Sequence, residues 1–224
     1  MHQPIAVQAW PGRLSFGPEG ILVLGLELTL AHSSAADART QARLALRQAL
    51  TQALAALLQR PLADLQIDNQ RGQPPRIRLA DGAASAPTPQ CSFAYSDTYA
   101  LAAVNLHGPI GVDLTPVMEM PDWQAVARDY LGPQEYIRLQ AMPAAQRPRA
   151  LAQAWCQLEA QLKCRAEALT EWQGEWEGAR LHRQASLLLP PYQQAPYQQQ
   201  AQQQAQQQVP PLVGHVVWRP AAAG

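Results

Sequence analysis

Three residues that could contribute to an active site lie four positions apart in the segment 155–163: Trp155, Glu159 and Lys163. On a helix this spacing places the three side chains on one face. Glu159 can form an i,i+4 ion pair with Lys163 there, worth about 0.2–0.5 kcal/mol to a helix, or its carboxylate can bind a metal ion. The local spacing leaves both interpretations open.

Asp113 and three arginines extend the set of candidate residues. Asp113 follows an apolar strand in the stretch 109–114, where a buried charge is costly unless it is paired or binds a metal ion. It can also cap a turn. Arg39, Arg43 and Arg47 share one helix face because they are spaced by four, and they form either a phosphate-binding row or a solvated surface.

The elements that position these residues begin with a strand over 20–30 and a helix over 31–61. Ser33 or Ser34 is the candidate helix cap and Pro61 the stop; the expected apolar face consists of Leu46, Leu50, Leu54 and Leu57. Two short strands around a Gly/Pro turn are expected within 64–82. A strand pair that turns at His107-Gly108-Pro109 is expected within 91–114.

Helix signals return over 121–142, interrupted at Gly132-Pro133, where a second helix can begin with proline in its first turn. A further helix is expected over 147–169, with one side lined by Leu151, Trp155, Leu158 and Leu162. A Gln-rich, low-complexity insert near 192–210 precedes a returning strand over 212–218, and we assign it no catalytic role. Strand, helix and strand character thus occurs twice, which predicts an α+β protein.

Composition excludes several classes of function. Seventeen basic and seventeen acidic residues give zero net charge, so no global positive field attracts nucleic acid or an anionic membrane. The longest apolar stretch, 21–31, contains Glu27 and is shorter than the roughly 20 residues of a membrane-spanning helix. The first residues lack the pattern of a signal peptide, so we expect a soluble cytoplasmic protein with reduced cysteines at 91, 156 and 164.

Several motifs occur in a specific order along the chain. Gly-x-Pro at 72–74 is followed by Phe-x-x-Ser at 93–96, Gly-Val-Asp at 111–113 and Trp-x-x-x-Glu-Ala-x-x-Lys at 155–163. The set resembles the 4′-phosphopantetheinyl transferases, in particular the long, pseudo-dimeric, surfactin-synthetase-activating type, from about Arg39 to Leu169. The resemblance implies two similar α/β halves, an N-terminal one over 1–107 and a C-terminal one over 108–224. One such chain completes its own site, so we expect a monomer.

The resemblance also implies an activity. These enzymes transfer the 4′-phosphopantetheine arm of coenzyme A to a serine of an apo acyl or peptidyl carrier protein and release 3′,5′-ADP. Asp113 and Glu159 would bind Mg²⁺, and Lys163 would contact the pyrophosphate or handle the serine proton. The expected coenzyme A contacts are Arg43, Arg47, Gln73 and Ser96. Glu159, Lys163 and a metal-bound water all remain candidates for the general base.

Four positions depart from the family pattern. Gln73 and Leu158 occupy positions where the family has lysine, Asp97 replaces a histidine, and Thr115 replaces a frequent acidic residue. Each cation lost beside a phosphate removes a charge-assisted hydrogen bond of about 1–3 kcal/mol. Two alternatives therefore remain: a catalytically weakened or inactive relative that only binds carrier protein, and an α+β domain of unrelated function.

Overall fold

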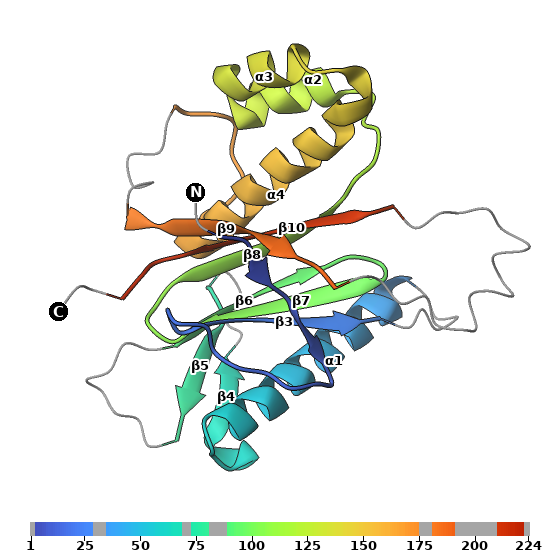
Figure 1. Cartoon of the computed structure of the whole chain (residues 1–224). Coiled ribbons are helices and arrows are strands. Elements are labelled where there is room, and N and C mark those ends of the chain that lie inside the picture. The colour runs from blue at the N-terminus through green and yellow to red at the C-terminus, as the bar shows by residue number, and fades with distance from the viewer. Residues whose placement is uncertain are drawn as a thin grey trace, which may run out of the picture.

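The computed structural model describes residues 3–28, 35–68, 73–80, 89–174, 181–190 and 210–221. Two β-sheets pack face to face, and each carries a long helix on its outer side, as Figure 1 shows with α4 above one sheet and α1 below the other. The chain is a mixed α/β protein. The candidate helix caps Ser33 and Ser34, Gly72, and the Gln-rich insert up to residue 209 lie outside the described residues.

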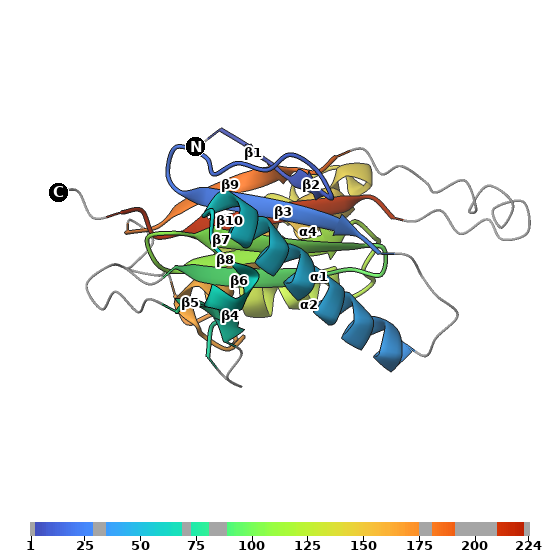
Figure 2. The same cartoon turned by 90° about the horizontal axis from the view of Figure 1, so that it is seen from below.

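The six-stranded sheet has the order β2-β3-β7-β6-β5-β4. Its strands are β2 (Gln8–Trp10), β3 (Ile21–Glu27), β4 (Leu65–Asp68), β5 (Arg76–Leu79), β6 (Gln90–Tyr95) and β7 (Tyr99–Asn105). Helix α1 (Ala35–Leu57) lies across its outer face (Figure 2), and the short 3-10 turn η1 (Leu62–Asp64) follows. Leu46, Leu50 and Leu54 are buried against this sheet, which confirms the apolar helix face predicted from the sequence.

The four-stranded sheet has the order β1-β9-β10-β8. Its strands are β1 (Ile5–Ala6), β8 (Ile110–Pro116), β9 (Arg183–Leu188) and β10 (Leu212–Trp218). Strand β1 pairs in parallel with β9, with Ile5 opposite Leu187, so residues near the start of the chain extend the sheet that is otherwise built from residues after 109. The division into halves at residue 107 stays a prediction.

Helix α4 (Arg147–Arg165) lies on the outer face of the four-stranded sheet with a different side from the one predicted. The buried side carries small residues spaced by four: Ala152, Cys156, Ala160 and Cys164. Leu151 and Leu162 are also buried, whereas Trp155 and Leu158 are only half-buried. Small side chains let the helix approach β8 and β10 closely, and hydrophobic periodicity, which gives weight to large residues, did not identify this contact face.

The connection between the sheet and α4 consists of short helical segments: α2 (Trp123–Val126), the π-helical turn η2 (Ala127–Leu131), α3 (Pro133–Gln140) and the 3-10 turn η3 (Ala144–Gln146). Pro133 begins α3 after Gly132, which has φ of 87°, as the sequence predicted. Tyr130 packs edge-on against Trp155 with 5.9 Å between the ring centroids. This contact fixes the connecting segment to α4.

The predicted strand pair over 91–114 is wrong in its turn. The hairpin is β6–β7, which turns at residues 96–98, whereas β7 and β8 lie in different sheets. Residues 106–109 therefore carry the chain from one sheet to the other. A pattern of apolar residues identifies a strand but not the strand with which it pairs. Because β7 is buried throughout, its residues do not indicate whether it pairs with β6 or with β8. Strand β9 was not predicted at all.

The core between the sheets contains apolar side chains from both: Val23, Leu101 and Ala103 from one sheet, and Val112, Leu114 and Val216 from the other. The three cysteines are free and buried, consistent with the predicted reduced thiols. Within the described ranges, no helix is long and apolar enough to cross a membrane.

The end of α4 offers a test of local backbone strain. Ala166 caps the helix in the left-handed conformation with φ of 58° and ψ of 37°. A non-glycine residue there is strained by about 1 kcal/mol, so Ala166→Gly is expected to increase the free energy of unfolding by roughly that amount. Urea unfolding monitored by circular dichroism measures the change. A decrease in stability would show that chain entropy of the unfolded state outweighs the strain.

Candidate active site

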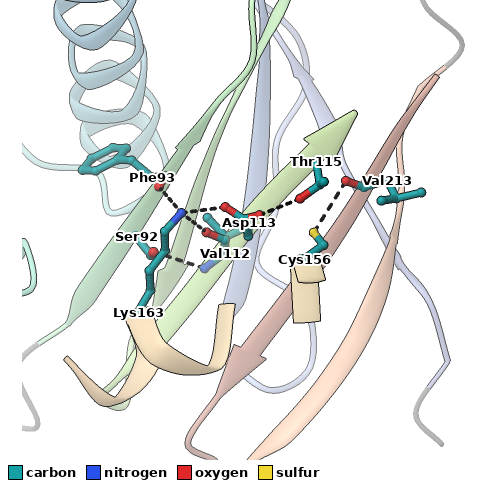
Figure 3. Close-up of polar contacts among 8 residues, drawn as sticks. All are labelled: Ser92, Phe93, Val112, Asp113, Thr115, Cys156, Lys163 and Val213. Atoms are coloured by element: carbon teal, nitrogen blue, oxygen red, sulfur yellow. Dashed lines mark hydrogen bonds and ion pairs between the residues drawn. The ribbon is translucent and has the colours of Figure 1, made fainter. Parts of the chain in front are cut away.

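Asp113 lies in the middle of β8 with its side chain directed toward α4. Its carboxylate is 13% exposed and is held from two sides (Figure 3). The Lys163 ammonium donates to Oδ1 at 2.8 Å, and the Thr115 hydroxyl donates to Oδ2 at 2.9 Å. The charge on β8 is thus paired, as its partial burial requires.

Lys163 also binds two main-chain carbonyls. Its Nζ lies 3.1 Å from the carbonyl oxygen of Val112 and 3.3 Å from that of Phe93. Val112 belongs to β8 and Phe93 to β6, so a single ammonium group joins the two sheets where they meet. Ser92 adds a second link, because its buried hydroxyl accepts the Val112 N–H at 3.1 Å. These side chains form hydrogen bonds with the main-chain N–H and carbonyl groups on the outer edge of β8, because none of the described strands pairs with β8 on that side.

Glu159 lies one helical turn before Lys163 and is half-buried. Partial burial, and next the negative charge of Asp113, raise the pKa of its carboxyl group, while Lys163 lowers it. Within the described part of the chain, Glu159 has neither a hydrogen bond nor an ion pair. The i,i+4 pair that the sequence allowed is therefore not formed, because Lys163 turns to Asp113 instead.

The predicted coenzyme A contacts are spread along the six-stranded sheet. The guanidinium of Arg47 lies 5.2 Å from the centroid of the Phe93 ring, and the charges of Arg47 and Arg43 lower the pKa of Tyr95, which burial raises overall. Arg43 is exposed and Arg47 is half-buried. Phe93 thus contacts Arg47 through its ring and Lys163 through its carbonyl, which connects the arginine row to the carboxylates.

The positions of Gln73 and Ser96 give little information about a contact with coenzyme A. Gln73 is exposed beside the start of β5. The hydroxyl of Ser96 donates to the carbonyl oxygen of Tyr99 at 3.1 Å and accepts the Tyr99 N–H at the same distance, so it closes the β6–β7 turn. Both roles toward coenzyme A stay predictions.

A metal ion at this site would depend on few protein ligands. Among the residues that the structure describes, no group of three or more His, Cys, Asp or Glu side chains is arranged to hold a metal ion. Mg²⁺ is, however, commonly bound by one or two carboxylates together with water and substrate phosphates. Glu159, which has no hydrogen-bond or ion-pair partner among the described residues, and Asp113, whose Oδ2 accepts from the Thr115 hydroxyl, are a donor set that fits this mode of binding.

A cavity of about 830 Å³ lies on the opposite flank of α4 and does not include the carboxylates. Its walls contain Gln157, Leu158 and Gln161 of α4, and Ser186 and His215 of the sheet. Leu158, which replaces an expected lysine, therefore faces this cavity and not Asp113. The cavity gives no support to a substrate position beside the carboxylates.

His215 supplies a pH-dependent prediction. It lies opposite Asp113 in the β8–β10 register, its Nε2 has no partner among the described residues, and burial lowers its pKa to about 4. Because the folded pKa is below the ordinary value near 6.5, stability is complete above pH 6.5 and falls as pH decreases toward 4. We expect His215→Phe to unfold with less difference between pH 7.5 and pH 5 in urea titrations than the parent chain. Equal pH sensitivity in both proteins would assign the acid effect to other groups.

Sequence reasoning missed the groups that orient Asp113. Thr115 was noted only for the absence of an acid, and Ser92 was not considered. Their hydroxyls hold, respectively, the side chain of Asp113 and the backbone beside it. The available signal in the sequence was a polar residue within an otherwise apolar strand. Ser92 is such a residue, and it is only 5% exposed in β6.

Comparison with known proteins gives a family match for the second part of the chain and a partial match to a protein of Synechocystis sp.. Residues 109–209 match the family model of the 4′-phosphopantetheinyl transferase superfamily. A protein of Synechocystis sp. that is named as a candidate 4′-phosphopantetheinyl transferase is 29% identical over 83 residues. That alignment covers 37% of this chain and 34% of the relative, so the match extends over about a third of the relative's length. Asp113, Glu159 and Lys163 lie within the family match, whereas Arg43 and Arg47 lie outside it.

Proposed function

We propose that this chain, which matches the 4′-phosphopantetheinyl transferase superfamily over residues 109–209, transfers the 4′-phosphopantetheine arm of coenzyme A to a serine hydroxyl of an apo acyl or peptidyl carrier protein. The observation that carries the proposal is the position of two carboxylates within the matched region: Asp113 of β8 is ion-paired with Lys163 of α4 at 2.8 Å, and Glu159 lies one helical turn before that lysine.

The reaction requires charge neutralisation more than covalent chemistry. The serine oxygen forms a bond to the phosphorus of the pantetheine phosphate, the bond from that phosphorus to the bridging oxygen of the pyrophosphate breaks, and 3′,5′-ADP leaves with the electron pair. The serine proton passes to a base. Bound Mg²⁺ would supply positive charge at the pyrophosphate, and Asp113 and Glu159 are the residues that would hold it.

The surrounding residues hold these carboxylates in place. Thr115 and Lys163 fix the two oxygens of Asp113, and partial burial limits access of water to Glu159. On the six-stranded sheet, Arg43 and Arg47 would bind the 3′-phosphate of coenzyme A, since planar guanidinium groups suit phosphate recognition. The packing of Arg47 over the Phe93 ring limits the orientations of its guanidinium group, which supports this role. In the same proposal the protein acts as a cytoplasmic monomer made of two similar halves.

Incubation with coenzyme A, Mg²⁺ and a panel of apo carrier proteins tests the proposal. Mass spectrometry is expected to show one phosphopantetheine added to at least one carrier, and omission of Mg²⁺ or addition of a chelator should abolish the addition. A transferase of established activity serves as the positive control for each carrier. If every carrier is modified by the control and none by this protein, the proposal is wrong.

A second candidate function is binding of carrier protein without transfer. It is favoured by Gln73 and Asp97, which are both exposed and provide no cation where the family places lysine and histidine. Isothermal calorimetry separates the two functions. Binding of a carrier protein together with no detectable binding of coenzyme A, with or without Mg²⁺, would support the second function and exclude the first.

A further inference from the structure

The cavity on the flank of α4 that faces away from Glu159 lies beside a part of the four-stranded sheet that α4 leaves uncovered. Helix α4 lies on the outer side of this sheet (Figure 1) and packs mainly on β8 and β10. On β9, the outward side chains of Ser186 and Leu188 are exposed and line the cavity of about 830 Å³. A helix flank and an open sheet face thus enclose a space that we call the α4–β9 groove.

The helix wall of the groove is a row of residues spaced by four: Arg149, Gln153, Gln157 and Gln161. The row extends along the helix for about 18 Å. Gln161 donates to the side-chain oxygen of Gln184 on β9 at 3.3 Å, which closes one end of the groove. Gln153 and Gln157 have no hydrogen-bond partner for their amide groups among the described residues. Two free amides therefore face the space between α4 and β9.

Trp172 provides an aromatic surface at the end of the groove near the start of α4. Its backbone N–H donates to the Asp129 carbonyl oxygen at 2.7 Å. Its ring covers Gly132, where an added methyl group would lie 2.7 Å from the indole. Trp172 is held in place by these contacts although it is 39% exposed, and Tyr130 and Leu131 line the same end. A ligand would meet a preformed apolar surface there.

The described residues of the lining carry one unpaired charge. Glu135 and Arg138 of α3 form an ion pair, and burial lowers the pKa of His215 to about 4, so His215 is neutral at pH 7. Arg149 is exposed and has no ion pair or hydrogen bond among the described residues. A positive charge in the first turn of a helix also opposes the helix dipole, so Arg149 does not stabilise α4. A ligand with one negative charge complements this lining.

An extended peptide matches the groove better than a compact small molecule. Its main chain presents an N–H and a carbonyl group to the same side at every second residue, about 6.8 Å apart, and a glutamine amide can both donate and accept. Side chains four apart on a helix are separated by a rise of about 6 Å, so the row and the peptide have nearly the same spacing. In a small-molecule site a few polar groups converge, whereas here they are spread along the groove.

We propose that the α4–β9 groove binds an extended peptide segment of a partner protein, uncharged except for one carboxylate that pairs with Arg149. Main-chain groups of the peptide bond to Gln153 and Gln157, and its alternate side chains pack against Trp172. The groove lies on the opposite flank of α4 from Glu159, so the inference goes beyond the proposed function and does not depend on it.

A library of synthetic nonapeptides on beads tests the proposal. The peptides consist of Ala, Ser, Thr, Val, Leu, Asn and Gln with one Asp at either end, and the full chain is labelled with a fluorophore. We expect the protein to select a subset of the beads. In fluorescence polarisation, replacing Asp by Asn in a selected peptide should weaken binding by about threefold or more. If no peptide binds above background to the folded protein, the proposal is wrong.

Substitutions in the row locate the binding site. The double variant Gln153→Ala/Gln157→Ala should weaken binding of a selected peptide by about tenfold or more, because both amide contacts are lost. Arg149→Gln should remove the difference between the Asp and Asn peptides. Gln48→Ala, on the exposed side of α1, is the matched control and should leave binding unchanged. Unchanged binding by the double variant would overturn the proposal.

The parent chain gives a test that needs no variant. When a selected peptide is added, NMR signals of the side-chain amides of Gln153 and Gln157 are expected to shift. Shifts confined to other parts of the protein would contradict the proposal even if the double variant does not fold. The titration contains no coenzyme A, so a failure of phosphopantetheine transfer would refute the proposed function and leave this result intact.

Two other occupants are distinguished by further outcomes. Sedimentation over a hundredfold range of concentration is expected to show no dimer that depends on the groove. A dimer that Gln153→Ala/Gln157→Ala dissociates would assign the groove to a second copy of the chain. Peptide binding that occurs only after residues 192–209 are replaced by a short Gly-Ser linker would assign the groove to that segment. Either result would overturn the proposal of a partner protein.

Discussion

Replacing Glu159 by glutamine is expected to abolish phosphopantetheine transfer while making the ligand-free protein more stable. The carboxylate is half-buried beside Asp113, and both effects raise its pKa above the ordinary value. A raised carboxyl pKa means that the folded chain disfavours the charged form, so the penalty is absent in acid and grows as pH rises through the folded pKa. Glutamine keeps the shape and removes the charge.

The loss of activity should be large because a proposed metal ligand is removed. We expect transfer to fall by about 1,000-fold or more, equivalent to roughly 4 kcal/mol of transition-state stabilisation. At pH 7.5 without Mg²⁺, Tm should rise by about 1–3 °C, and at pH 4 the gain should be smaller. Differential scanning calorimetry at the two pH values and the carrier-modification assay measure these changes.

Glu167→Gln is the matched control, because Glu167 follows the same helix but is exposed and ion-paired with Arg165. It should keep transfer activity within about twofold and gain no stability. If Glu159→Gln retains transfer, Glu159 does not bind the catalytic metal. If it lowers stability at neutral pH, Glu159 forms a stabilising contact that outweighs its burial.

Gly111→Ala is expected to have the largest effect on stability of any substitution considered. A methyl group at Gly111 would lie 1.9 Å from the carbonyl oxygen of Ala160 and 2.4 Å from the backbone nitrogen of Cys164. Both atoms belong to the backbone of α4, so no side-chain rotation relieves the clash. The helix would have to move away from β8, and we expect a loss of more than about 3 kcal/mol in the free energy of unfolding.

Gly214→Ala on the neighbouring strand β10 provides the comparison. Its added methyl group would meet only side-chain atoms of Leu187, the nearest at 3.0 Å, and these can shift. Denaturant unfolding should therefore show a loss at least about 2 kcal/mol smaller than for Gly111→Ala. Equal losses would mean that α4 moves freely over the sheet. In that event Asp113 and Glu159 would not be held at a constant separation.

The sequence allowed prediction of the elements whose signals are local. The leucines of α1, the proline that begins α3 and the apolar run of β3 each depend on residues within a few positions, and the structure confirms them. The ordered motifs similarly indicated a family, and the model of that family matches residues 109–209. The roles of Asp113 and Glu159 as metal ligands remain predictions.

The rest depends on contacts between distant parts of the chain. Strands β7 and β8 follow each other but join different sheets, and the residues of neither strand indicate which sheet it joins. The side of α4 that packs on the sheet was misjudged because Gly111, some fifty residues earlier, creates the space that small residues fill. Lys163 was expected to face a phosphate, and its contact with Phe93 depends on β6 lying next to β8.

Strand β1 has a consequence for the order in which the protein can fold. Ile5 and Ala6 pair with Leu187 and Leu188, so this strand pair joins two segments that are far apart in the sequence. The edge of β9 is covered only when the loop from β1 to β9 closes, and closing so long a loop is slow because its entropy is lost before any contact compensates. During synthesis the six-stranded sheet with α1 can form first, whereas the layer that carries Asp113 must wait for β9 and β10.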